Sequence, residues 1–187
     1  MSRDSLVLSP LIVIAGPTAV GKTSLALDLA QQVIAELINA DSRSFYRGMD
    51  IGTAKPTAAD RAIVQHHLID ILEPADEMSL SRFQKLAFDA IDHVAASGRL
   101  PFLVGGTAQY LNAVVENWII PQVAPDTAFR EAMEQRLLND GVNVLLDDLR
   151  QIDPDSAQRS GPNPRRIIRA LEIHRATGKP MSELQGK

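Results

Sequence analysis

The stretch Leu11–Thr23 reads Leu-Ile-Val-Ile-Ala-Gly-Pro-Thr-Ala-Val-Gly-Lys-Thr. Its apolar part, Leu11–Ala15, is rich in β-branched side chains, which is typical of a parallel strand covered on both faces. The part Gly16–Thr23 matches the phosphate-loop pattern G-x-x-x-x-G-K-[ST], and an Ala/Leu-rich helical pattern follows over Thr23–Ala35. A strand, a glycine loop and a helix in this order predict a P-loop α/β fold.

The glycine loop is predicted to bind a diphosphate or a longer phosphate chain. Backbone N–H groups of such a loop and of the following helix converge on an anion. Lys22 adds a positive charge, and the Thr23 hydroxyl can ligate Mg²⁺. The residues of this site are Gly16, Pro17, Thr18, Ala19, Val20, Gly21, Lys22 and Thr23. The loop alone does not choose between a kinase, an NTPase and another enzyme that binds a diphosphate.

Strand and helix patterns alternate through the first part of the chain. Further strands are predicted at Glu36–Ala40, His67–Leu72 and Leu100–Val104, and a helix from Ser79 or Ser81 through Ala96. The first helix has its apolar positions Leu25, Leu29 and Val33 at helical spacing. The segment 45–57 contains two glycines and a proline and is predicted to be an ordered loop. This alternation predicts a mainly parallel, P-loop NTPase-like sheet flanked by helices.

Only helix signals follow Pro121. They cover Thr127–Asn139, Val142–Ile152 and Pro164–Thr177, each ended by a glycine or proline. We therefore divide the chain into a P-loop catalytic core, residues 1–120, and an all-helical subdomain, residues 121–187.

Composition limits the class of protein. With 187 residues and 45% hydrophobic residues, the chain can form a folded core. It has no cysteine, which excludes a disulfide, a thiol nucleophile and a Cys-ligated zinc, and which is compatible with the reducing cytoplasm that we expect as its location. The apolar stretch Leu6–Ala15 is too short to cross a membrane and contains Pro10, so we interpret it as a buried strand.

Charge is distributed unevenly along the chain. The net charge is −4, but from Arg159 onward there are seven basic and two acidic residues, a local charge of +5 that leaves −9 for the remainder. An acidic core that carries a basic nucleic-acid face would show such asymmetry. A solvated helix face is the alternative.

Two further positions are candidates for the reactive site. Asp41 follows the second predicted strand, at the sheet edge where open α/β folds bind ligands, and could act as a general base or a metal ligand. Its alternative role is to cap the turn into Ser42–Arg43. The turn Gly105–Thr107 follows a later strand and brings the Thr107 hydroxyl to the same edge. Its alternative is an ordinary turn with Thr107 as the helix N-cap.

Signals for ATP hydrolysis are weak. A typical ATPase has a second apolar strand that ends in an Asp behind Mg²⁺, and Ile69–Asp70 is the nearest approach to that pattern. His66 and His67 are adjacent, so in a strand they face opposite sides, and we interpret both as structural.

The runs Asn39–Arg43 and Tyr46–Pro56 resemble the tRNA dimethylallyltransferase family. Both are long and distinctive: Asn-Ala-Asp-Ser-Arg and Tyr-Arg-Gly-Met-Asp-Ile-Gly-Thr-Ala-Lys-Pro. Supporting matches are the glycine loop, His67–Asp70, Leu103–Thr107 with Tyr110, and Arg165–Glu172. The resemblance covers nearly the whole chain, in the family's order.

The resemblance implies roles for individual residues. Gly16–Thr23 would hold the diphosphate of dimethylallyl diphosphate, with Lys22 and Mg²⁺, placed by Thr23, stabilising the leaving group. Asp41 would be the general base, and Thr107 would lie at the reactive site. The residues matching the family's tRNA-contacting positions are Asp41, Ser42, Arg43, Ser44, Thr107, Arg130, Arg165, Arg166, Ile167, Ile168 and Arg169.

The implied reaction is transfer of the dimethylallyl group to N6 of the adenosine next to the anticodon, in tRNAs that read codons beginning with U. The implied partner is a tRNA anticodon stem-loop, and we expect a monomer without membrane association. The resemblance also implies that the chain stops before the family's returning C-terminal core helices. The alternatives are an adenylate isopentenyltransferase, a small-molecule P-loop kinase and an inactive RNA-binding fragment.

Overall fold

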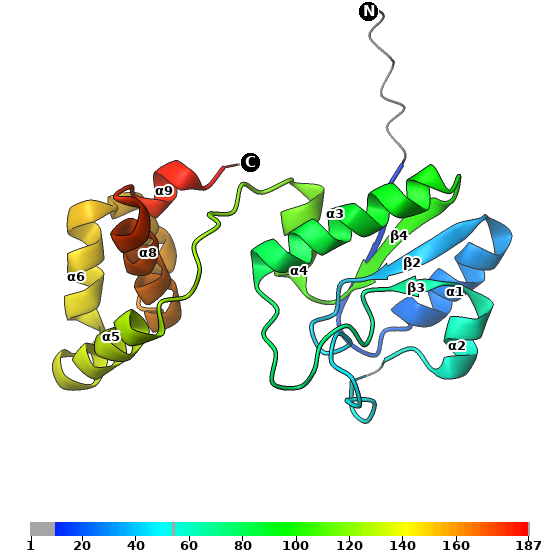
Figure 1. Cartoon of the computed structure of the whole chain (residues 1–187), viewed down its shortest axis with the longest axis horizontal. Helices are drawn as coiled ribbons and strands as arrows, with labels where there is room; N and C mark the ends of the chain where they lie inside the picture. Colours follow the sequence, from blue (N-terminus) through cyan, green and yellow to red (C-terminus); the bar gives the residue numbers. More distant parts are fainter. Residues whose placement is uncertain (1–9, 54, 187) are drawn as a thin grey trace, which may run out of the picture. The chain divides into compact units, whose positions relative to one another are not determined.

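The computed structural model describes residues 10–53 and 55–186, and these divide into two compact units between Asn117 and Trp118 (Figure 1). Residues 6–9 of the apolar stretch, Ala54 of the Tyr46–Pro56 run and Lys187 lie outside the described residues. The division between the units falls three residues before the boundary we placed after residue 120.

The first unit is built on a parallel sheet. Its strands are β1 (Ile12–Ala15), β2 (Ala35–Asn39), β3 (His66–His67) and β4 (Leu100–Gly105), in the order β1-β4-β2-β3. Every pairing within it is parallel. This confirms the α/β class expected from the alternation of strands and helices.

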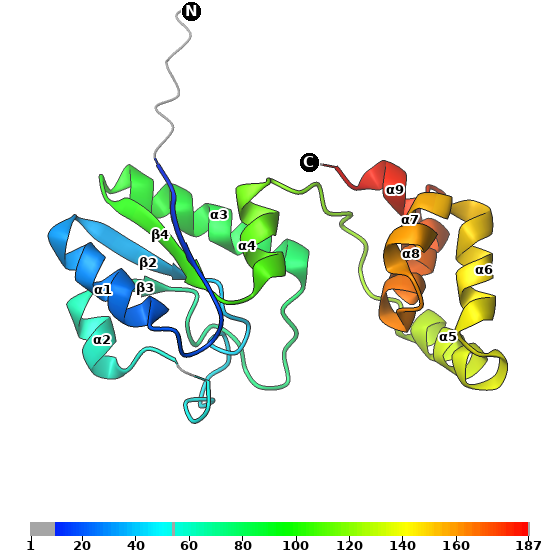
Figure 2. The same ribbon diagram turned by 180° about the vertical axis from the view of Figure 1, so that it is seen from behind.

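Helices cover both faces of this sheet (Figures 1 and 2). On one face lies α1 (Lys22–Gln32), with α2 (Ala58–Ile63) beside it, and on the other lie α3 (Leu80–Ala96) and α4 (Ala108–Val115). Adjacent strand residues divide between the two layers. Leu37 and Phe102 pack on the α1 side, whereas Ile38 and Leu103 pack on the α3 side.

Helix α1 buries a different face from the one its large apolar residues suggest. Ala26, Leu27 and Ala30 are buried, whereas Leu25 and Leu29 are 51% and 37% exposed. The small alanines let the helix approach the sheet closely. Val33 lies beyond the helix, which ends at Gln32, and Ala35 opens β2, so the helix predicted over Thr23–Ala35 is too long.

Strand β1 is an edge strand among the described residues. Its Ile12 and Val13 are 38% and 39% exposed, and only Ile14 is buried. The expectation that this strand is covered on both faces is therefore wrong for the described part of the chain.

The segment after β2 is a loop, as predicted, and is anchored by aromatic packing. Phe45 is fully buried, with its ring centroid 5.8 Å from that of Phe83 and 5.7 Å from that of Tyr110. Backbone N–H groups of Ile71 and Leu72 donate to the Phe45 carbonyl at 2.8 and 3.0 Å. The strand predicted over His67–Leu72 is shorter than expected, because Leu68 and Asp70 adopt left-handed backbone conformations.

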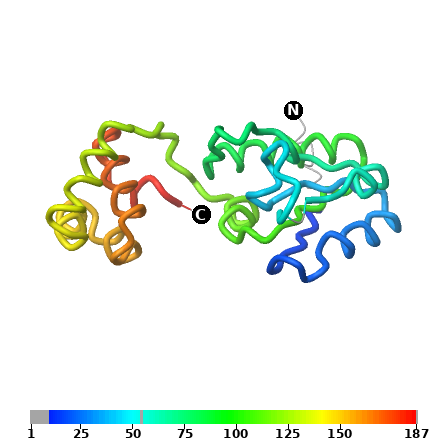
Figure 3. The backbone as a smooth tube through the Cα atoms, turned by 90° about the horizontal axis from the view of Figure 1, so that it is seen from below, coloured from blue at the N-terminus to red at the C-terminus, as the bar shows by residue number. Residues whose placement is uncertain are grey.

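The second unit is helical, as predicted (Figure 3). Its helices are α5 (Thr127–Asp140), α6 (Val142–Ile152), α7 (Pro154–Ser160), α8 (Pro164–Thr177) and α9 (Met181–Leu184). Its core contains Leu145 and Leu149 from α6 with Ile167 and Ala170 from α8. The short helices α7 and α9 were not predicted.

Candidate diphosphate and acceptor site

The glycine loop joins β1 to α1 as its sequence pattern requires. Gly21 is the N-cap of α1 and has φ of +88°, a left-handed conformation that glycine adopts without strain. Ala19 also has a positive φ, +67°. The loop therefore turns back on itself directly before the helix N-terminus, where backbone N–H groups can meet an anion.

Lys22 lies at the centre of this loop. Its Nζ donates to the Pro17 carbonyl at 2.6 Å. It also lies 3.7 Å from the point that a Cβ atom on Gly106 would occupy. The ammonium group thus faces the turn after β4 as well as its own loop.

Asp41 approaches the same glycine as Lys22. Its Oδ2 is also 3.7 Å from that Cβ point of Gly106, so the carboxylate and the ammonium face the same space. Its Oδ1 accepts from the Arg43 N–H at 3.1 Å, which is the turn-capping role that we considered as an alternative. No described residue donates to Oδ2. One oxygen therefore fixes the turn, and the other remains available to a ligand.

Thr107 fixes the neighbouring backbone. Its Oγ1 accepts from the Ser42 N–H at 3.2 Å, and its side chain does not cap α4, although Thr107 occupies the N-cap position. The preceding Gly105 allows this close approach. A Cβ atom there would lie 2.3 Å from the carbonyl carbon and oxygen of Ala40.

These segments enclose a cavity of about 400 Å³ at the carboxyl ends of the strands. Its walls include Lys22, Thr23, Asp41, Ser44, Lys55 and His66. Ser44 is 3% exposed overall, so within this stretch Arg43 is the side chain open to solvent. The loop and the Asp41–Ser44 stretch thus line one cavity.

His66 lies in the wall of this cavity, and its pKa is lowered. Burial lowers its pKa most, and although the Val64 carbonyl opposes this, the net shift is downward. Nδ1 lies 2.7 Å from the Val64 carbonyl oxygen and so carries the proton. Nε2 is buried and has no partner among the described residues.

His67 lies on the other side of the strand, as expected for an adjacent residue. Its Nε2 is 2.5 Å from Oε2 of buried Glu36, whose other oxygen contacts Arg99. Burial raises the pKa of Glu36, but hydrogen bonds from His67 and Arg99 outweigh it and lower that pKa. This cluster lies at the start of β2, away from Asp41.

In the helical unit, the residues matched to a tRNA surface fall into three groups. Arg165 and Arg166 line a groove of about 870 Å³ at the N-terminus of α8, with Asn163 and Ser160. Ile167 is fully buried and Ile168 is 7% exposed. The side chains of these two residues belong to the core, so they can serve a surface only by holding α8 in place.

Arg130 and Arg169, the third group, form ion pairs with Glu172. Glu172 is 1% exposed, and its carboxylate receives the Arg130 Nε at 2.7 Å, one Arg169 nitrogen at 2.5 Å and the Asp126 N–H at 2.8 Å. Burial raises the pKa of Glu172, but these hydrogen bonds outweigh it and lower the pKa to about 2. Sequence reasoning missed this carboxylate.

Among the described residues, no group of three or more His, Cys, Asp or Glu side chains is arranged to hold a metal ion. None of the helices in the described ranges is both long and apolar enough to span a bilayer. A metal at the Thr23 hydroxyl would therefore need oxygen ligands from a bound phosphate chain.

The fold and this site define a P-loop α/β protein with a pocket suited to a phosphorylated ligand. The IPP transferase family model matches residues 44–187. The tRNA dimethylallyltransferase of Roseiflexus sp. (strain RS-1) is 57% identical over 175 residues, covering 93% of this chain and 57% of the relative. The tRNA dimethylallyltransferase of Herpetosiphon aurantiacus is 51% identical over 178 residues, covering 94% of this chain and 56% of the relative. The chain belongs to the IPP transferase family.

Solved structures agree with this assignment. A tRNA isopentenylpyrophosphate transferase from Bacillus halodurans is 47% identical with a TM-score of 0.60, covering 92% of this chain and 57% of that one. A eukaryotic dimethylallyltransferase acting on tRNA is 31% identical with a TM-score of 0.73, covering 94% of this chain and 44% of that one. The chain spans less than two thirds of the length of these relatives.

Proposed function

We propose that this chain forms the diphosphate-binding and acceptor-activating part of a tRNA dimethylallyltransferase. The donor would be dimethylallyl diphosphate, and the acceptor would be N6 of the adenosine next to the anticodon. The observation that carries the proposal is that Lys22 Nζ and Asp41 Oδ2 each lie 3.7 Å from the Cβ point of Gly106, in the lining of one cavity. A cation for the leaving group and a carboxylate for the nucleophile thus face the same space.

The glycine loop suits the leaving group of this reaction. As the allylic C–O bond lengthens, positive charge develops on the five-carbon fragment and negative charge on the diphosphate oxygens. Backbone N–H groups of the loop and the Lys22 ammonium would stabilise that negative charge, because groups fixed before reaction need little rearrangement. Lys22 would exchange the Pro17 carbonyl for a phosphate oxygen.

Asp41 suits the acceptor. The exocyclic amino group of adenine is a poor nucleophile, and its proton must leave as the new C–N bond forms. Oδ2 is open to receive that proton, while Oδ1 holds the carboxylate in place through Arg43 N–H. Thr107 holds the adjacent Ser42 backbone and so supports the same geometry.

Mg²⁺ fits this site only together with the donor. The Thr23 hydroxyl and diphosphate oxygens would hold the ion, which supplies positive charge opposite the leaving group when bound. Thr23 lies at the start of α1 and lines the same cavity as Lys22.

The exposed basic side chains Arg165 and Arg166 suit the phosphates of an anticodon stem-loop. The adenosine would leave the base stack to reach Asp41, since a stacked base hides its amino group. We further propose that the enzyme acts as a cytoplasmic monomer on tRNAs that read codons beginning with U.

The test is to incubate the protein with labelled dimethylallyl diphosphate and Mg²⁺, and to offer unmodified tRNA, AMP or ATP. Label in the adenosine next to the anticodon supports the proposal. Label in AMP with none in tRNA would replace it with an adenylate prenyltransferase, and phosphate transfer from ATP would replace it with a kinase.

Variants of the two facing groups sharpen this test. Lys22→Ala should weaken pyrophosphate binding, and Asp41→Asn should abolish transfer while leaving pyrophosphate binding largely intact. Asp28→Asn is the matched control, because Asp28 is exposed on α1 and does not line the cavity. Loss of pyrophosphate binding in Asp41→Asn would instead indicate a metal ligand.

A further inference from the structure

Lys55 is a buried charge in the wall of the cavity. Its side chain is 2% exposed, and its Nζ lies 2.7 Å from each of three oxygens: the Tyr46 carbonyl, Asp50 Oδ1 and Asp70 Oδ1. An ammonium group has three N–H donors and no acceptor. All three donors are therefore occupied, so Lys55 is not the group that binds a phosphate in this cavity, although it lines it.

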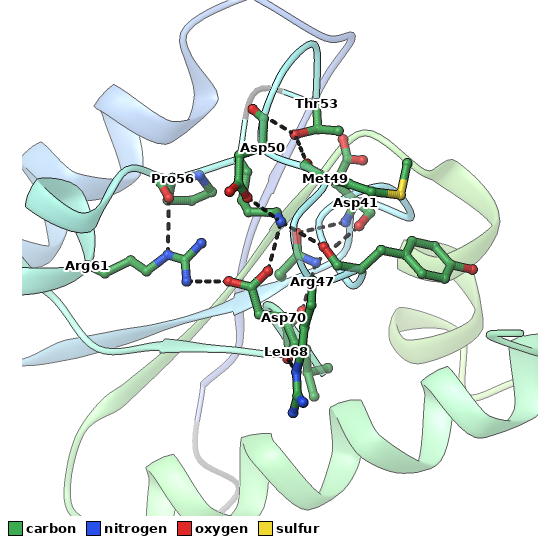
Figure 4. A network of polar contacts seen from close by, with 12 residues as sticks. Asp41, Arg47, Met49, Asp50, Thr53, Pro56, Arg61, Leu68 and Asp70 are labelled. Carbon is green, nitrogen blue, oxygen red and sulfur yellow. Dashed lines mark hydrogen bonds and ion pairs between the residues drawn. The ribbon is translucent and has the colours of Figure 1, made fainter. Parts of the chain in front are cut away.

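The charges around Lys55 balance. Burial lowers the pKa of Lys55, but Asp50 and Asp70 outweigh it and raise that pKa, so the ammonium stays charged. Asp70 also receives Arg61 NH1 at 2.6 Å on its second oxygen. Two cations and two anions thus form one closed group, in which Asp70 is the shared carboxylate (Figure 4).

Asp70 connects this group to the acceptor stretch. Its backbone N–H donates to the Ser44 carbonyl at 3.1 Å. Two residues earlier, the Leu68 carbonyl accepts from Asn39 Nδ2 at 3.0 Å. The Asn39 side chain also donates to the Asp41 carbonyl and accepts from the Asp41 N–H. The segment Leu68–Asp70 therefore contacts Ser44 directly and is linked to Asp41 through the Asn39 side chain.

The conformation of this segment depends on such contacts. Leu68 and Asp70 have φ of +58° and +56°, a region that is unfavourable for residues other than glycine. Strained backbone of this kind persists where the surroundings hold it in place. Lys55 and Arg61 fix the Asp70 carboxylate and so help to hold this backbone in place.

We infer that Lys55 is a positioning residue for the acceptor stretch: its ammonium ties the 46–55 loop to Asp70, and Asp70 in turn fixes Asp41–Ser44 against the cavity. Lys55 does not touch the reacting atoms. Its effect on prenyl transfer rests on the proposed function, whereas its effect on the backbone does not.

The test compares Lys55→Met with two controls. Lys85→Met makes the same substitution at a lysine outside the network. Lys85 forms a surface ion pair with Asp89, and the two side chains are 77% and 60% exposed. Asp50→Asn alters only one of the three contacts, at a carboxylate whose side chain is 70% exposed, and keeps Lys55 in place. Hydrogen exchange, pyrophosphate affinity and prenyl transfer to tRNA are measured for each.

In Lys55→Met, amides in 41–47 and 68–72 should exchange about tenfold faster or more, while those of α3 keep their wild-type rates. Pyrophosphate affinity should stay within about twofold of wild type, because Lys55 makes no contact with the glycine loop, and transfer should fall at least about tenfold. The amide exchange rates and prenyl transfer of Asp50→Asn should lie between those of Lys55→Met and wild type. Lys85→Met should behave as wild type.

Several outcomes would overturn the inference. Unchanged exchange in 41–47 and 68–72 would do so, as would equal acceleration throughout the first unit with loss of pyrophosphate binding, which indicates general destabilisation. Loss of transfer with unchanged exchange would place Lys55 in contact with substrate. If Lys55→Met does not fold, Lys55→Arg replaces it, since a planar guanidinium cannot reach the same three oxygens and should loosen the same segments. A wild-type chain inactive in transfer counts against the proposed function, and the exchange data still decide the role of Lys55.

Discussion

Glu172→Gln gives a quantitative test of the helical unit. In the native protein the Glu172 carboxylate is 1% exposed and receives Arg130, Arg169 and the Asp126 N–H. Its pKa of about 2, in place of the usual 4.5, corresponds to about 3 kcal/mol of stability at neutral pH. Replacing it with Gln keeps the shape but removes the charge opposite two arginines, so we expect a loss of about 3 kcal/mol at pH 7.

The dependence on pH separates this account from a simple packing effect. Because the folded-state pKa lies below the unfolded value, the stabilisation is complete above pH 4.5 and is lost as the pH falls through about 2. At pH 3 the unfolded carboxyl is mostly protonated and the folded one is not, so wild type should already have lost about 2 kcal/mol from this group. Glu172→Gln has no such loss. The difference in free energy of unfolding between wild type and Glu172→Gln should therefore shrink from about 3 kcal/mol at pH 7 to about 1 kcal/mol at pH 3.

The assay is urea unfolding at pH 7 and pH 3, followed by the fluorescence of Trp118, the single tryptophan and the first residue of the second unit. Glu131→Gln is the control, because Glu131 is exposed on α5. A gap of the same size at both pH values would refute the reasoning, since the carboxylate would then contribute by shape and not by charge.

Three other substitutions test local features of the fold. Gly105→Ala should destabilise the first unit by about 3 kcal/mol or more, because the new Cβ would lie 2.3 Å from the Ala40 carbonyl. Thermal unfolding should show a smaller loss for Gly106→Ala, whose Cβ would lie 3.1 Å from its nearest atom. Ser79→Ala should cost about 1 kcal/mol in urea unfolding, because the Ser79 hydroxyl accepts from the Arg82 N–H at the start of α3; no loss would mean that the cap is replaced by water. Asp153→Asn should lower the free energy of unfolding by about 2 kcal/mol, because the two Asp153 oxygens accept from the Ser156 and Ser182 N–H groups at 2.9 Å each. Burial raises the pKa of Asp153, but these hydrogen bonds outweigh it and lower that pKa, so the stability difference from wild type should be complete above pH 3.8 and decline below it.

The glycine loop and the acceptor stretch could be predicted because each is contiguous in sequence. Gly16–Thr23 has a strand before it and a helix after it, and Asp41 lies two residues after the end of β2. Parallel strands end at the same edge of a sheet, so the sequence was sufficient to bring these residues to one site. In the structure Lys22 and Asp41 line one cavity, whereas their roles in it stay predictions.

Short helices were missed where the decisive signal was a cap and not a periodic pattern. Helix α2 has six residues, too few for an apolar stripe, but Thr57 and Asp60 form a capping box that could have predicted it. Helix α7 begins with Pro154 after Asp153, whose side chain caps it. We had interpreted that proline only as the end of the preceding helix.

The ion networks could not be predicted, because their members are distant in the sequence. Arg130 lies 42 residues from Glu172, and Lys55 lies 15 from Asp70. A family resemblance marks such residues as functional without saying whether they contact a ligand or another side chain. Here Arg130 and Arg169 contact Glu172, so the basic side chains lining the α8 groove are those of Arg165 and Arg166.

The order of the strands explains why two glycines follow β4. Strand β4 lies between β1 and β2, so the turn after it separates the glycine loop from the acceptor stretch. Any side chain at position 105 would collide with the Ala40 backbone, and one at 106 would enter the space between Lys22 Nζ and Asp41 Oδ2. A side chain at either position would therefore disturb the cavity that Lys22 and Asp41 line.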